Sequence, residues 1–322
     1  MSSCLERDKV RVLIPYDPKV ARYNAAVIRV GGNSIFLARE VPRDGVMPGI
    51  PDRGKLIIYR LEPELPEAKM IGQLDLSHGE INNWEDARAC SGKNGEVLIG
   101  LTAIRARDNR PVAATVRGNI VDNNFSINKE SLIVYPNDEG KNVTPISLNQ
   151  FLFRREGFRH SLEVIEYNEN EEGEKKIKVI RTIEFTKRPW CEWQIGTQAQ
   201  LLPGGILPIH GVNRFSLGVD QHTGEEVFGY AYSLGLALLD EDLNVVDMSD
   251  TPLFTRESFK DILPMGKELD ANKDVIYCCG YSVDGDIIKF VINIGDLMTV
   301  EVTKSLLELR KELRLGSPFA II

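Results

Sequence analysis

Short runs of β-branched, aromatic and other apolar residues recur along the whole chain, bounded by Gly, Pro, Asn or Asp. This pattern is typical of strands in sheets. The charged segment 168–176 separates two such runs and is predicted to be a hairpin loop. The predicted strands are residues 9–14, 25–30, 34–40, 55–61, 96–104, 111–118, 130–136, 150–156, 160–168, 175–185, 197–205, 206–212, 227–240, 274–283 and 287–295.

One segment near the end of the sequence has helical spacing instead. Leu306, Leu309 and Leu313 recur at intervals of three and four positions, with charged residues between them. We therefore expect one short helix from about Ser305, packed on the outside of an otherwise all-β protein.

The rhythm of the strands favours a β-propeller. Roughly four strands occur in each sixty or so residues, as in four-stranded blades around a channel, and about five such units fit into 322 residues. A two-sheet sandwich is the alternative, but its usual size is about 100 residues and the chain has no Pro/Gly/Ser linker. We predict an all-β, five-bladed β-propeller with a short C-terminal helix, with residues 1–322 as a single domain.

Charge and apolar patterning exclude several classes of partner. The net charge is −8 and no long basic run occurs, so a nucleic-acid partner is not expected. A single small anion such as phosphate remains compatible with this balance. The sequence shows no signal peptide or membrane span, and we expect a cytoplasmic protein without a membrane partner.

Cysteine and histidine spacing argues against a metal centre. The five cysteines are scattered and show no Cys-x-x-Cys pair, so we expect reduced core thiols. Cys278 and Cys279 are adjacent in a predicted strand and should point to opposite faces. The four histidines show no metal-ligand spacing either.

The segment from Asn82 to Cys90 places charged residues at the start of an apolar strand. Strand alternation would put Asp86 and Arg88 on one face and Glu85 on the other. The first strand of a propeller blade lines the channel, so Asp86 and Arg88 would face it together. The alternative is a surface ion pair, which contributes little to stability.

Other polar groups stand at the ends of predicted strands, where a propeller could bring them to one mouth. A single polar residue of this kind more often has a structural role. His210 is explained equally well as a hydrogen-bonded core histidine and as a site residue. These residues are Asn24, Arg39, Arg154, Arg155, Arg159, His160, His210 and Asp296.

The order of these segments resembles glycoside hydrolase family 130, the five-bladed β-propeller enzymes that act on β-mannosides. The resemblance runs over nearly the whole chain, and it rests on the order of the motifs because no single motif is specific. Ala87 departs from the family signature, which has Pro there, and Val291-Ile292 replace an aromatic pair. The matching segments are Tyr23-Asn24 with Arg39, Glu85-Asp86-Ala87-Arg88, Ile209-His210-Gly211, Gly235 to Asp240, Cys279-Gly280 and Asn293 to Asp296.

The resemblance implies cleavage of β-mannosidic linkages with inversion, by phosphorolysis to α-mannose 1-phosphate. Asp86 would be the catalytic proton source, while Glu85, which strand alternation places on the opposite face, would hold the turn. Inorganic phosphate would be a co-substrate, with no other cofactor and no metal, and a homo-oligomer is left open. The implied substrate-binding residues are Asn24, Arg39, Glu85, Arg88 and Asp296, and the implied phosphate-binding residues are Arg154, Arg155 and His210.

Two other functions remain open at this point. Hydrolytic members of the family use carboxylates in place of the phosphate cluster, so an inverting β-mannoside hydrolase is the first alternative. The second is a non-catalytic carbohydrate-binding propeller, in which the polar residues need not converge on one anion site. His210 and the arginine-rich segment 154–159 favour phosphorolysis.

Overall fold

The computed structural model describes residues 9–30, 33–43, 54–92, 94–122, 124–169, 175–197, 200–220, 223–263 and 273–313. These parts are almost entirely β-structure, with one short α-helix, α1 (Leu306–Glu312), and one 3-10 turn, η3 (Arg256–Phe259). Within them, no helix combines the length and apolar character needed to cross a bilayer.

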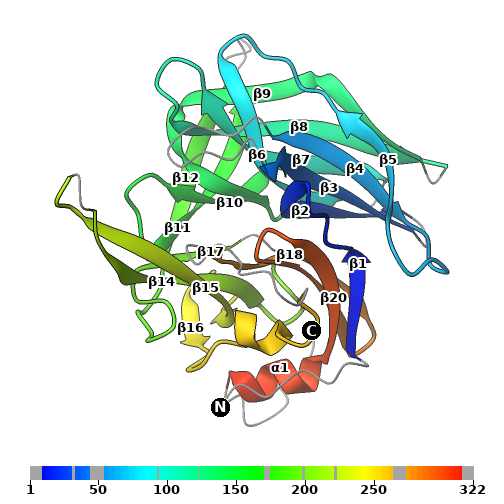
Figure 1. Ribbon diagram of the computed structural model, residues 1–322. Helices are drawn as coiled ribbons and strands as arrows, with labels where there is room; N and C mark the ends of the chain where they lie inside the picture. The colour runs from blue at the N-terminus through cyan, green and yellow to red at the C-terminus, as the bar shows by residue number, and fades with distance from the viewer. Residues whose placement is uncertain are drawn as a thin grey trace.

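Strands account for most of the ribbon in Figure 1. In chain order they are β1 (Val10–Ile14), β2 (Val20–Val30), β3 (Asn33–Pro42), β4 (Lys55–Leu61), β5 (Lys69–Leu74), β6 (Ile81–Ser91), β7 (Glu96–Arg105), β8 (Pro111–Val121), β9 (Asn124–Pro145), β10 (Gln150–Arg155), β11 (Ser161–Glu169), β12 (Lys175–Glu184), β13 (Gln194–Gly196), β14 (Ile206–Val219), β15 (Glu226–Leu239), β16 (Val245–Met248), β17 (Lys273–Asp274), β18 (Ile276–Asp284), β19 (Ile287–Ile294) and β20 (Met298–Ser305).

The described strands form successive antiparallel groups of four. β2 to β5 make the first sheet, and β13 to β16 make another, to which β17 adds in parallel. A seven-stranded sheet runs from β6 to β12. The first part of its long strand β9 pairs with β8 and the last part with β10, so β9 belongs to two groups of four.

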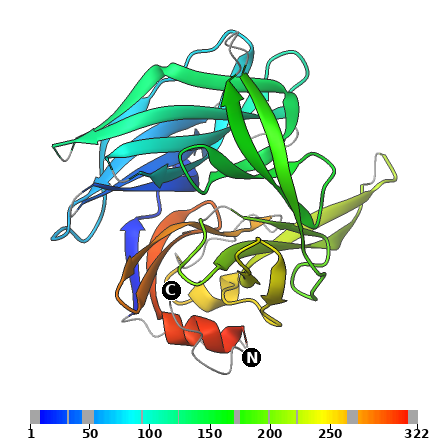
Figure 2. The same cartoon turned by 180° about the vertical axis from the view of Figure 1, so that it is seen from behind.

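The last sheet joins the two ends of the described chain. Its order is β1-β20-β19-β18, and Val10 of β1 lies opposite Val302 of β20. Figures 1 and 2 show β1, in blue, lying along the orange strands of this sheet. The strand β2 contacts both β6 and β18, and β18 contacts β14 and β15. Strands from different sheets therefore lie side by side at the centre of the molecule.

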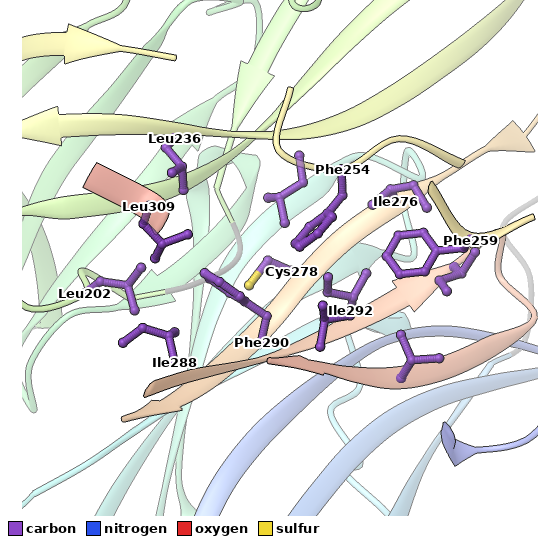
Figure 3. Packing of buried hydrophobic residues seen from close by; sticks show 14 of the residues in the cluster. Leu202, Leu236, Phe254, Phe259, Ile276, Cys278, Ile288, Phe290, Ile292 and Leu309 are labelled. Carbon is purple, nitrogen blue, oxygen red and sulfur yellow. The ribbon is translucent and has the colours of Figure 1, made fainter. Parts of the chain in front are cut away.

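The helix packs on the largest apolar cluster of the core. Leu306, Leu309 and Leu313 are buried there, as their spacing predicted, and Figure 3 shows Leu309 beside Leu202 and Leu236. The helix begins after Ser305, whose Oγ accepts a hydrogen bond from the Glu308 backbone N–H at 3.1 Å. The Glu308 side chain accepts one from the Ser305 N–H at 2.6 Å, which completes a capping box.

Most of the predicted strands are confirmed, but one is wrong and others were not predicted. The described part of 197–205 is not a strand, since Gly204 and Gly205 have positive φ and form a turn before β14. The predicted hairpin between β11 and β12 is confirmed by the pairing of Glu169 with Lys175, although its tip lies outside the described residues. The strands without a counterpart among the predicted ranges are β5, β6, β13, β16 and β20.

The four described cysteines are buried and free. Cys278 belongs to the cluster beneath the helix, whereas Cys279 belongs to a different cluster that includes Ala25. The prediction that these neighbours point to opposite faces is therefore confirmed. Cys4 lies outside the described residues.

Candidate active site

Three strands that meet at the centre of the molecule each contain an extra residue near Asp86, and β6 has a second one between Ile81 and Asn83. The pairing shifts by one position at Asn24 in β2, between Glu85 and Arg88 in β6, and at Cys279 in β18. Such β-bulges turn side chains out of the regular alternation and occur next to active sites. In β6 the backbone of Asp86 is left-handed, with a φ of 53°.

The bulge overturns the predicted separation of Glu85 from Asp86. Glu85 does not face away: its carboxylate lies 3.0 Å from Arg39 Nη2 and 3.7 Å from Lys141 Nζ. The charges of Arg39 and Lys141 also act on Asp86. The same two cations therefore act on both carboxylates, and the extra residue removes the regular alternation that predicted opposite faces for them.

Asp86 is held as an ionised carboxylate. Burial acts to raise its pKa, but the positive charges of Arg88, Lys141 and Arg39 act in the opposite direction and prevail, so the pKa lies below its ordinary value. The Asn24 side chain also donates a hydrogen bond to Oδ1 at 3.0 Å, which favours the charged form. Without a bound ligand, Asp86 is therefore a base rather than an acid at neutral pH.

Arg88 is a buried cation with unused hydrogen-bonding capacity. Only 1% of the residue is exposed, and its Nη1 donates to the Ala87 carbonyl at 2.5 Å. In the described part of the chain, its Nε and Nη2 have no acceptor. Arg88 also lines a cavity of about 30 Å³ with Thr144 and Gln200, which has room for about one water molecule. A ligand or water is needed to satisfy these donors.

His210 on β14 is 3% exposed, and the charge of Asp86 acts on it. Its ring lies 5.3 Å from that of Tyr277 and 6.1 Å from that of Tyr232. Burial first, and then the charges of Arg154 and Arg88, hold its pKa well below the ordinary value. His210 is therefore neutral at physiological pH and offers a hydrogen bond rather than a charge.

The fit around His210 depends on a glycine in β13. A Cβ placed on Gly196 would lie 2.5 Å from both Cε1 and Nε2 of His210 and 2.9 Å from Asn142 Nδ2. Any side chain at this position would therefore displace the imidazole ring.

The structure separates the two adjacent arginines of β10. Arg154 acts electrostatically on His210, and the charge of Asp86 acts on Arg154. When the Gln194 amide is turned so that its oxygen faces Arg154, that oxygen accepts from Nη1 at 2.5 Å and from Nε at 3.2 Å. Arg155 instead pairs with Glu163 at 2.9 Å and with Asp138 at 3.6 Å. Consecutive strand residues point to opposite faces, so only Arg154 joins the cluster around Asp86.

Asp296 approaches from the turn between β19 and β20. It is 6% exposed, and its left-handed backbone has a φ of 54°. Its carbonyl oxygen accepts a hydrogen bond from the Arg22 N–H at 3.0 Å, and its charge acts on Tyr232 and Tyr277. The predicted residues that these contacts and charges bring together are Asn24, Arg39, Glu85, Asp86, Arg88, Arg154, His210 and Asp296.

Sequence reasoning missed several members of this cluster. Tyr232 and Tyr277 lie inside apolar runs, where nothing marks them as site residues. Lys141 precedes Asn142, whose φ is 59° at an irregularity in the pairing of β9 with β10. A Gly-Lys-Asn sequence in a strand-rich region was the one available signal, because Gly and Asn tolerate such backbone.

The neutral state of His210 predicts a loss of stability in mild acid. Its folded pKa lies below the ordinary value of 6.5, so the unfolded chain takes up the proton first as the pH falls. The contribution of His210 is therefore complete above about pH 6.5 and decreases below it, by up to about 1.4 kcal/mol per pH unit. Urea unfolding at pH 7.5 and 5.5 measures the loss, which should be smaller in His210→Asn.

Ring-nitrogen NMR provides a direct check, because it should find the His210 ring neutral at pH 5.5. A charged ring at that pH, or equal losses in the wild type and the variant, would contradict the assignment.

Among the described residues, no group of three or more His, Cys, Asp or Glu side chains is arranged to hold a metal ion. The polar groups described above are instead cations, carboxylates, tyrosines and amides. Such groups suit a ligand that carries both hydroxyl groups and negative charge.

No protein-family model matches the chain, and no curated protein matches its sequence. Solved structures do match its fold. A β-1,2-mannobiose phosphorylase from Listeria innocua, in complex with β-1,2-mannobiose, superposes with a TM-score of 0.62 over 97% of this chain and 95% of its own, at 13% identity. A structure from the GH130 family of mannoside phosphorylases, which contains glycoside hydrolases that target β-1,2-mannosidic linkages, gives a TM-score of 0.59. The match covers 93% of this chain and 92% of that chain, at 11% identity.

The fold is that of the GH130 mannoside-active enzymes. A mannose phosphorylase from Leishmania mexicana, solved with a phosphate ion, also has it, with a TM-score of 0.52 over 97% of this chain and 92% of its own at 11% identity. The GH130 fold therefore extends over nearly all of this chain, although few residues are shared.

Proposed function

We propose that the protein cleaves β-mannosidic linkages by phosphorolysis with inversion, releasing α-mannose 1-phosphate. The proposal rests on the convergence of carboxylates and cations around Asp86, together with a fold shared with phosphorylases and hydrolases of mannosides. For the fold, we propose that the successive groups of four strands are the blades of a closed, five-bladed, single-domain propeller. The completion of the last sheet by β1 supports this arrangement.

The observation that carries phosphorolysis is an excess of positive charge at the site. The site contains four cations and three carboxylates, and His210 is neutral. The cations are Arg39, Arg88, Lys141 and Arg154, and the carboxylates are Glu85, Asp86 and Asp296. In the described part of the chain, Arg88 has no acceptor for two of its donors and Arg154 has no ion pair. A phosphate dianion would supply both the missing charge and the missing acceptors.

In the proposed reaction, a phosphate oxygen attacks C1 of the mannosyl unit while the bond from C1 to the leaving oxygen breaks. Attack from the opposite face inverts the configuration at C1. The leaving oxygen takes a proton from Asp86, through a sugar hydroxyl in the manner that the family resemblance implies. Phosphate thus takes the place of the base and water of an inverting hydrolase.

Phosphate binding also accounts for how an ionised Asp86 can become a proton donor. The cations that depress the pKa of Asp86 are those that would pair with phosphate. Once their charge is neutralised, burial remains and raises the pKa of the carboxyl group. The site would therefore take up its proton as phosphate binds.

Hydrolysis is the second candidate, and the position of Glu85 favours it. Glu85 is adjacent to Asp86 and shares two cations with it. Inverting hydrolases require two carboxyl groups, one acting as acid and one as base. The protein therefore contains a carboxylate that could activate water if phosphate does not bind.

Product analysis separates these reactions. The protein is incubated with β-linked manno-oligosaccharides, with and without inorganic phosphate. We expect mannose 1-phosphate only when phosphate is present, and little free mannose under either condition. Free mannose at the same rate in both incubations would replace phosphorolysis by hydrolysis. No cleavage in either incubation would reject both in favour of a carbohydrate-binding propeller.

A further inference from the structure

A second pocket, of about 300 Å³, opens beside the residues around Asp86. Its volume is at the lower end of the range for small-molecule sites. Lys141 and Arg154 line this pocket and also act electrostatically with Asp86. A ligand that extends from Asp86 past these two side chains would therefore enter the pocket.

The pocket carries positive charge that the protein does not fully neutralise. Lys141 pairs with Glu85, and Arg155 pairs with Glu163. Among the described residues, however, Arg154 and Arg159 have no ion-pair partner.

One carboxylate, that of Glu156, also lines the pocket, and its charge acts on Arg154 from beyond ion-pair distance. The lining nevertheless contains more cations than carboxylates. A negatively charged group would be attracted there.

Aromatic side chains form the other part of the lining. Phe158 is 41% exposed and follows the Gly157 turn, and Trp193, directly before β13, lines the same pocket. The Arg159 guanidinium lies 5.0 Å above the Trp193 ring. An arginine stacked in this way keeps its N–H edge available for carboxylate or phosphate oxygens.

Trp193 has a donor of its own to satisfy. Its indole Nε1 is buried and has no acceptor in the described part of the chain. Leaving such a group unpaired is costly, so a ligand oxygen nearby would be stabilised. The exposed Phe158 ring, the Arg159 edge and the Trp193 N–H together suit a sugar ring that carries an anionic substituent.

We propose that this pocket binds an anionic sugar unit, one that carries a carboxylate or a phosphate ester. Its position next to the unit cleaved at Asp86 rests on the proposed function, but the binding itself does not. The substrate class would then be mannosides joined to an acidic sugar, rather than purely neutral oligosaccharides. Arg159 and Trp193 are the residues that would select it.

Tryptophan fluorescence tests the pocket without any turnover. The full-length protein is titrated with D-glucuronate, D-mannose 6-phosphate and neutral methyl α-D-mannoside, and Trp193→Phe identifies the signal that comes from the pocket. We expect at least one anionic sugar to bind about tenfold more tightly than the neutral sugar. Arg159→Gln should remove most of this preference, because one charge-assisted contact is worth roughly a factor of ten.

Arg214→Gln is the matched control. Arg214 is exposed and stacks on Phe228, outside the pocket lining, so the same change there should leave the preference intact. A response to both anionic sugars would assign recognition to negative charge in general. A response to mannose 6-phosphate alone would assign it to a phosphate ester.

The proposal is overturned if the three sugars bind equally, if none binds, or if Arg159→Gln keeps the full preference. It is also overturned if inorganic phosphate gives the same Trp193 signal at the same concentration and Arg159→Gln removes that signal, since the pocket itself would then recognise a bare anion. These outcomes are separate from cleavage of neutral manno-oligosaccharides. Cleavage of neutral manno-oligosaccharides with no charge preference rejects only this inference, whereas charge preference with no cleavage of either neutral or acidic mannosides rejects only the proposed function.

Discussion

Replacing Asp86 with Asn is expected to lower turnover of a β-mannoside about a hundred- to ten-thousandfold, the range for loss of a general acid. The amide retains the shape of the side chain and can still contact Asn24, which donates to Oδ1 in the wild type. It cannot gain and release the proton that the leaving oxygen needs. Steady-state kinetics on the substrate found by product analysis would show a reduced kcat, and calorimetry would show that binding survives.

The control for this experiment is Asp284→Asn, the same chemical change on an exposed residue at the end of β18. It should retain wild-type turnover. If Asp86→Asn retains most of its activity, Asp86 is not the proton source. If it loses sugar binding together with turnover, its main role is to hold the substrate.

The Glu85→Gln variant should lose about 3 kcal/mol of unfolding free energy, because it removes one partner of a buried ion pair. The Glu85 and Arg39 side chains are 11% and 7% exposed, and they lie 3.0 Å apart. Gln retains the size of the side chain but not its charge. Chemical denaturation would measure the loss, and turnover should fall much less than in Asp86→Asn.

A double-mutant cycle with Arg39→Gln isolates the pair. Removing both charges should cost less than the sum of the two single changes, since both single changes remove the same interaction. An inactive Glu85→Gln protein with unchanged stability would give the opposite result. It would reverse the roles of the two carboxyl groups and make Glu85 the residue that acts on the substrate.

The parts of the fold that follow local rules could be predicted from the sequence. Residues 57–61 of β4 are alternately buried and partly exposed, and the leucine spacing of α1 corresponds to one buried face. In contrast, β6 was recognised only as the start of a strand, because its polar side chains face the site instead of an apolar layer. The four-residue strand β16 was too short to give a pattern.

The site was harder to predict because bulges shape it. Nothing in the sequence shows that Asp86 adopts a left-handed backbone, since no glycine marks the position. Strand alternation therefore predicted opposite faces for Glu85 and Asp86. The same rule assigns opposite faces to Arg154 and Arg155. Lys141 was missed for a further reason: its neighbours in space depend on how β9 passes between two groups of strands.

The pairing of β1 with β20 has a consequence for synthesis on the ribosome. Val10 is translated long before Val302, its partner, and at usual elongation rates the interval is about fifteen seconds to a minute. During that time the apolar strand β1 has free backbone groups that could pair with another nascent chain. The last sheet can form only after β20 has left the exit tunnel, so truncated translation products would expose β1 and be natural clients of chaperones.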